Sequence, residues 1–128
     1  MTELTANVSW LAVIIGAVVA FLAGWLWYSP MLFGPKWAEG VGVEMGTASD
    51  MPLPAMGAQA LGLLLLSWFV GVTAASNLLA TVLLATVAFT VLGYSGSLFT
   101  KKSAYAARTD AGYWLVAVVL MIVVQGIF

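Results

Sequence analysis

Few side chains in this sequence could carry out chemistry, and the usual catalytic types are missing. The chain has no histidine and no cysteine, so it lacks the commonest general base, the usual axial haem ligand and any thiolate. Serine, threonine and tyrosine hydroxyls remain, but none has a partner base within the long apolar segments. Because catalysis needs a nucleophile, an acid–base pair or a metal in a pocket, the sequence predicts no enzyme, no catalytic or metal-binding residue and no cofactor.

The charged residues lie outside the apolar segments. They are Glu3, Lys36, Glu39, Glu44, Asp50, Lys101, Lys102, Arg108 and Asp110. The formal net charge is −1, which gives no basic field for nucleic acid. Proton-coupled transport usually requires ionisable groups inside the membrane, and the apolar segments carry none.

The composition is that of a chain dissolved in lipid. Hydrophobic residues make up 63% and charged residues 7% of the sequence, with a mean hydropathy of +1.09, against roughly 45–50% and 25% in soluble domains. Residues 1–9 contain Glu3 but no basic residue, so the first apolar segment differs from a signal peptide, which has a basic start. The lipid bilayer is the expected environment of the whole chain.

Four segments are long and apolar enough to cross a bilayer, which takes about 20 residues as a helix. They span residues 8–28, 56–75, 79–99 and 112–128. Pro30 ends the first segment, because the residue before a proline avoids the helical region. The sequence predicts one all-α domain over residues 1–128, an integral membrane four-helix bundle.

The basic residues set the expected orientation. All four fall in the loops 29–55 and 100–111, so the positive-inside rule places both loops in the cytoplasm and both termini outside. Aromatic residues at the segment ends fit membrane-interface belts. These residues are Trp10 at the outer face and Trp25, Trp27, Tyr28 and Trp37 at the inner face.

Small residues predict how the helices pack, since close backbone approach holds helices together in lipid. Such stripes occur in the first three segments: Ser9, Ala12, Gly16, Ala20 and Ala23; Gly57, Ala60, Ser67, Gly71 and Ala74, with Leu64 among them; Thr81, Ala85, Ala88 and Ser95, with Leu92 among them. The fourth segment is mostly Val, Leu and Ile. We therefore expect the first three helices to form the core and the fourth to face lipid or a partner.

A second stripe in the third segment leaves two interpretations open. Thr86, Thr90, Gly93 and Ser97 could line a polar path or contact another subunit. Alternatively, the threonine hydroxyls bond back to carbonyl groups one turn earlier, as they often do in helices.

An internal match suggests a duplicated helix–loop–helix hairpin. Residues 28–38 (YSPMLFGPKWA) and 94–104 (YSGSLFTKKSA) share Tyr, Ser, Leu, Phe, Lys and Ala in register. Duplication would give a parallel repeat of two plus two helices, with a two-fold axis along the membrane normal. Coincidence between two similar interfacial segments is the alternative. The duplication would place a candidate ligand or partner surface at Trp27, Tyr28, Ser29, Trp37, Tyr94 and Ser95.

The end of the first apolar segment has the pattern Gly24-x-x-Trp27-Tyr28-Ser29-Pro30-x-Leu32-Phe33-Gly34-x-x-Trp37. This pattern resembles a bacterial family of small four-helix membrane proteins, the domain-of-unknown-function 1761 family. Leu98-Phe99 and Ala111-Gly112-Tyr113-Trp114 are similar to it as well. Asp110 stands where members often carry Asn. The resemblance implies the fold and a bacterial inner-membrane location, and it implies no activity or substrate.

The same element predicts an elbow after the first helix. Ser29 is expected to cap, and Pro30 to start, a short interfacial helix that Gly34-Pro35 ends. Trp37 and Lys36 would anchor the chain beyond this elbow at the lipid headgroups.

Two classes of function remain. The first is a non-catalytic scaffold or accessory subunit that packs with itself, as a homo-oligomer, or with a larger membrane complex. The second is a small oligomeric channel or carrier for a neutral or lipid-like solute. A carotenoid, quinone or lipid could lie in the apolar grooves in either case.

Overall fold

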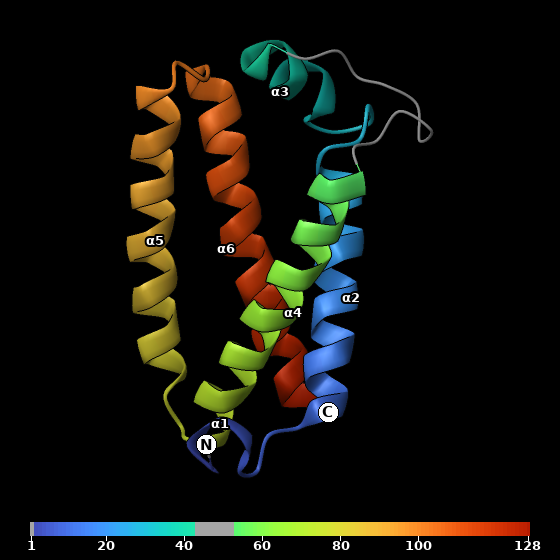
Figure 1. The fold of residues 1–128 in the computed structure, drawn as a ribbon, viewed down its shortest axis with the longest axis vertical. Coiled ribbons are helices and arrows are strands. Elements are labelled where there is room, and N and C mark those ends of the chain that lie inside the picture. The colour runs from blue at the N-terminus through green and yellow to red at the C-terminus, as the bar shows by residue number, and fades with distance from the viewer. Residues whose placement is uncertain (1, 43–52) are drawn as a thin grey trace.

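The computed structural model describes residues 2–42 and 53–128, and this part of the chain is helical without strands. Its helices are α1 (Thr2–Thr5), α2 (Trp10–Trp27), α3 (Gly34–Val41), α4 (Leu53–Ala75), α5 (Leu79–Phe99) and α6 (Ala104–Ile127). The long helices α2, α4, α5 and α6 are each long and apolar enough to cross a membrane. Both termini and the α4–α5 turn lie at one end of the bundle, and α3 and the α5–α6 turn lie at the other (Figure 1).

The reversal between α5 and α6 is tighter than the sequence suggested. Helix α6 begins at Ala104 rather than at Gly112, so only residues 100–103 separate the two helices. Lys101 turns the chain with a positive φ of 64°, and the hydroxyl of Ser103 accepts a 3.0 Å hydrogen bond from the Ala106 amide. This cap satisfies a free amide at the helix start, so Arg108 and Asp110 belong to the helix instead of a loop.

The elbow after α2 also differs from the prediction. Residues 28–33 form turns, and Gly34-Pro35 begins helix α3 instead of ending one. The expectation was wrong because proline suits the first helical turn, where its missing N–H has no partner to lose. Ser29 does not cap a helix start, since its hydroxyl donates to Leu26 O at 2.7 Å. Gly42 ends α3 in the left-handed conformation, with φ of 87°.

Helix α6 is the centre of the bundle, which corrects the expectation that it faces lipid. It has more buried residues than any other helix of the described chain, and α5 buries only Val82. The bulky side chains of α6 fill the space between α2, α4 and α5. Small residues alone did not predict the core, because interior volume must also be filled to close-packed density.

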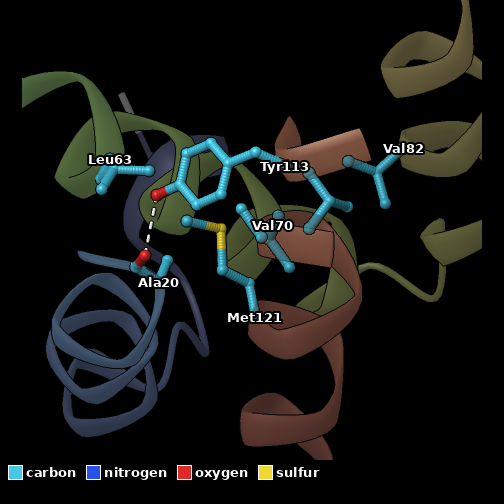
Figure 2. Close-up of a cluster of buried hydrophobic side chains, with 8 residues drawn as sticks. Ala20, Leu63, Val70, Val82, Tyr113 and Met121 are labelled. Carbon is cyan, nitrogen blue, oxygen red and sulfur yellow. Dashed lines mark hydrogen bonds between the residues drawn. The ribbon is translucent and has the colours of Figure 1, made fainter. Parts of the chain in front are cut away.

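Tyr113 of α6 occupies the middle of this core (Figure 2). It belongs to the same buried cluster as Leu63, Val70 and Met121, and it is 1% exposed. Its hydroxyl donates a 2.7 Å hydrogen bond to the carbonyl oxygen of Ala20. A buried hydroxyl needs such a partner, and this bond joins α6 to α2.

The small-residue prediction for the first segment holds for three of its five residues, since Ser9 and Ala23 are only half-buried. Ala12, Gly16 and Ala20 are buried, and a Cβ on Gly16 would lie 2.8 Å from the Ser67 hydroxyl oxygen. That hydroxyl donates to Val13 O at 2.7 Å. The α2–α4 interface is therefore a close backbone approach fixed by a side-chain bond.

The small-residue prediction is wrong for α5. None of its predicted stripe (Thr81, Ala85, Ala88, Leu92 and Ser95) is buried. In the second stripe, Thr86 donates to Val82 O at 2.7 Å, which confirms the back-bonding interpretation for that residue. Most of α5 therefore faces outward from the bundle.

The duplicated hairpin stays a prediction. Pairs α2–α4 and α5–α6 each form an antiparallel hairpin with extensive contacts, as duplication requires (Figure 1). However, α2 packs much more closely on α6 than α5 does on α4. Tyr28 comes directly after the end of α2, whereas Tyr94 lies inside α5.

Candidate functional site

Polar and aromatic side chains converge at the end of the bundle that carries α3. Four of them form what we call the Asp110 cluster: Tyr28, Trp37, Lys102 and Asp110. They come from the end of α2, from α3, from the α5–α6 turn and from α6. Chain segments distant in the sequence therefore meet at one carboxylate.

Asp110 accepts hydrogen bonds from the other three members. The hydroxyl of Tyr28 and the indole Nε1 of Trp37 both donate to Oδ1, the latter at 2.9 Å. The ammonium of Lys102 lies 2.7 Å from Oδ2 in an ion pair whose side chains are 25% and 20% exposed. Hydrogen bonds to a charged acceptor are shorter and stronger than neutral ones. The carboxylate is thus held by donors of its own chain.

Backbone contacts between α3 and the start of α6 place Trp37 opposite Asp110. The Ser103 amide donates to Gly40 O at 3.0 Å. A Cβ on Gly40 would lie 2.0 Å from the Ser103 hydroxyl oxygen, so only glycine permits this approach. Gly34 and Ala38 are buried on α3.

A layer of aromatic rings supports the cluster from the core side. Tyr28 contacts Trp37 and Tyr113 edge to face, with ring centroids 5.0 and 5.7 Å apart. The Nε1 of Trp27 donates to Thr109 O at 2.9 Å, and the Trp27 ring would lie 3.1 Å from a Cβ on Gly112. Edge-to-face contacts stabilise such a layer beyond area burial.

The environment keeps Tyr28 protonated. Burial raises the pKa of the Tyr28 hydroxyl well above its usual range, and the bond to Asp110 raises it further. Ionisation would put a second negative charge beside the carboxylate. Tyr28 therefore acts as a hydrogen-bond donor at neutral pH. The cluster joins α2, α3 and α6 by hydrogen bonds and an ion pair.

The structure brings together three of the six predicted site residues. Trp27, Tyr28 and Trp37 surround residues 109–110, and their internal hydrogen bonds go beyond the membrane-belt role that the sequence predicts for them. Trp10 and Trp25, by contrast, are 44% and 59% exposed.

The other three predicted residues lie elsewhere. Ser29 is engaged with its own turn. Tyr94 and Ser95 are half-buried on α5, and Ser95 borders a shallow depression with Leu98 and Phe99. Within residues 2–42 and 53–128, no hydrogen bond or ring contact joins Tyr28 to Tyr94. The shared groove between the two tyrosines stays a prediction.

Sequence reasoning missed Asp110, Lys102 and Tyr113. The sequence predicts a loop at residues 100–111 that holds both Asp110 and Lys102. This prediction therefore missed that Asp110 lies on helix α6 and that Lys102 lies in the turn before it. One usable signal was the spacing of Asp110 and Tyr113, since residues three apart share a helix face. In the part of the chain that the structure describes, no group of three or more acidic, His or Cys side chains could hold a metal ion.

The four helices that are long and apolar enough to cross a membrane indicate the class of multi-pass membrane proteins. The family described as "Protein of unknown function (DUF1761)" matches residues 11–126, so the chain belongs to this family. No curated protein matches the chain, and no solved structure matches it.

Proposed function

We propose that the protein is a non-catalytic membrane scaffold or accessory subunit that packs with itself or with a larger membrane complex. The observation that carries the proposal is the outward face of α5. This helix buries only Val82, and its glycines Gly93 and Gly96 have no atom within 4 Å of an added Cβ. Small residues on an apolar face allow another helix to approach closely in lipid.

The polar groups at the α3 end support a structural role as well. The acceptors of Asp110 are occupied by Tyr28, Trp37 and Lys102, so the cluster stabilises the fold instead of awaiting a substrate. On α5, Thr86 donates its hydroxyl to Val82 O, which weighs against a water-lined path. We therefore favour the scaffold over the channel or carrier for a neutral or lipid-like solute.

The location belongs to the same proposal. We place the protein in a bacterial inner membrane, with both termini outside and residues 29–55 and 100–111 in the cytoplasm. The support is that α3 and the α5–α6 turn, which carry Lys36, Lys101 and Lys102, share one end of the bundle (Figure 1). Basic residues concentrate on the cytoplasmic side of membrane proteins.

Native mass spectrometry of the protein extracted with its lipids tests the proposal. We expect an oligomer or a complex that dissociates when Gly93→Leu or Gly96→Leu enlarges the α5 face. Gly62→Leu is the matched control, because Gly62 on α4 also has open space around an added Cβ. A monomer that carries a bound neutral solute, unchanged by the α5 variants, would favour the carrier instead.

A further inference from the structure

Lys36 and Tyr105 form a further contact between α3 and the first turn of α6. The Lys36 ammonium lies 5.3 Å from the centre of the Tyr105 ring. At this distance a cation is attracted to the ring face, so the charge is held near α6. Tyr105 thereby favours one position of an exposed, flexible side chain.

Arg108 adds a second positive charge to the first turns of α6. It lies three residues after Tyr105 on α6, and residues at this spacing are neighbours on a helix surface. Both Lys36 and Arg108 are exposed. Two like charges near one ring repel each other, and a shared anion would relieve that repulsion.

Neither Lys36 nor Arg108 forms an ion pair within the described residues. Within residues 2–42 and 53–128, the Asp110 carboxylate forms its ion pair with Lys102. It is therefore already occupied. Glu39 is exposed on α3 and forms no ion pair in this part of the chain. Glu44 and Asp50 lie outside the described residues.

We propose that Lys36 and Arg108, which both neighbour Tyr105, bind the phosphate group of an anionic phospholipid. An arginine fork can donate two parallel hydrogen bonds to a phosphate, and a lysine supplies a point charge. The pair lies at the end of the membrane-crossing helices, where α2 exposes Trp25 in its last turn. Because tryptophan favours the headgroup level, a lipid is the phosphate source at this depth.

The lipid preference of the purified full-length protein tests this proposal. In a nonionic detergent, native mass spectrometry would count bound dioleoylphosphatidylglycerol and dioleoylphosphatidylcholine as each is added. We expect a preference for the anionic lipid. The Lys36→Gln and Arg108→Gln variants should each weaken its binding about fivefold, and the double variant about 25-fold. Binding of phosphatidylcholine should not change.

Two control comparisons make the test specific. Lys101→Gln removes one positive charge from an exposed turn residue and should change the affinity less than about twofold if the pair is the site. Tyr105→Phe keeps the aromatic ring and should bind as the parent does. Tyr105→Leu removes the ring and should weaken binding about two- to fivefold. Circular dichroism would show that each variant is folded.

Three results would overturn the proposal. The first is equal binding of the two lipids. The second is an equal loss in Lys101→Gln, which would mean diffuse attraction to the basic end. The third is displacement of the lipid by inorganic phosphate but not by chloride at equal ionic strength, which would identify a soluble ligand. None of these results bears on the oligomeric state, so the scaffold proposal is tested separately.

Discussion

The indole Nε1 of Trp37 lies 2.9 Å from Oδ1 of Asp110, although 73 positions separate the two residues. This hydrogen bond fastens the short helix α3 to the central helix α6. Tyr28 donates to the same oxygen, so the end of α2 is tied to the same point. One carboxylate thereby fixes the path of the chain between its first long helix and α3.

Substitution of Asp110 should separate its two kinds of contact. Asp110→Ala leaves the Tyr28 and Trp37 donors without an acceptor and should lower the free energy of unfolding by about 2–3 kcal/mol. Asp110→Asn keeps an acceptor oxygen for both donors but loses the partly exposed Lys102 ion pair and the added strength of a charged acceptor, which together should cost about 1 kcal/mol. Thermal unfolding in detergent measures both. Equal losses would mean that the ion pair, and not the two hydrogen bonds, stabilises the cluster.

Gly40→Ala should destabilise the contact between α3 and α6. The added Cβ would lie 2.0 Å from the Ser103 hydroxyl oxygen, and such overpacking costs about 1–3 kcal/mol. Adding Ser103→Gly removes the two nearest atoms and leaves the Ala106 Cβ at 3.0 Å, so it should restore part of the loss, since a glycine cap costs only a few tenths of a kcal/mol. Gly57→Ala is the control, because open space surrounds Gly57. If the Gly40 variant melted like this control, α3 would not be docked on Ser103.

The close approach of α2 and α4 can be tested with larger residues. Gly16→Leu and Gly71→Leu should force the helices apart and lower the melting temperature, because added Cβ atoms would lie 2.8 Å from Ser67 and 2.9 Å from Val13. Val119→Leu, at a side chain that is 51% exposed, should change little. Thermal stability in detergent checks this order. An equal fall in all three variants would show that the interface lies elsewhere.

The orientation can be read from labelling, since the chain has no cysteine of its own. Glu3→Cys and Lys101→Cys would be treated on whole cells with a thiol reagent that does not cross membranes. We expect labelling at position 3 only, because the basic residues favour a cytoplasmic α5–α6 turn. Labelling at position 101 but not at position 3 would reverse the topology.

Much of the architecture can be predicted from the sequence because the lipid environment imposes it. A chain that crosses a bilayer must satisfy its backbone groups within each helix, so apolar length alone predicted the four long helices, and α5 has the predicted bounds 79–99. The buried small residues of α2 were predicted for a related reason, since Ala12 and Gly16 allow close backbone approach.

The tertiary structure alone decided which helix is central and where the polar groups meet. Apolar segments look alike in composition, whether they face lipid or the interior, so the burial of α6 around Tyr113 and the exposure of α5 had no signature in the sequence. The Asp110 cluster joins residues from four segments. Its formation depends on the packing of α3 against the start of α6, which the missing side chain at Gly40 permits. These are long-range packing relations, which local residue patterns do not encode.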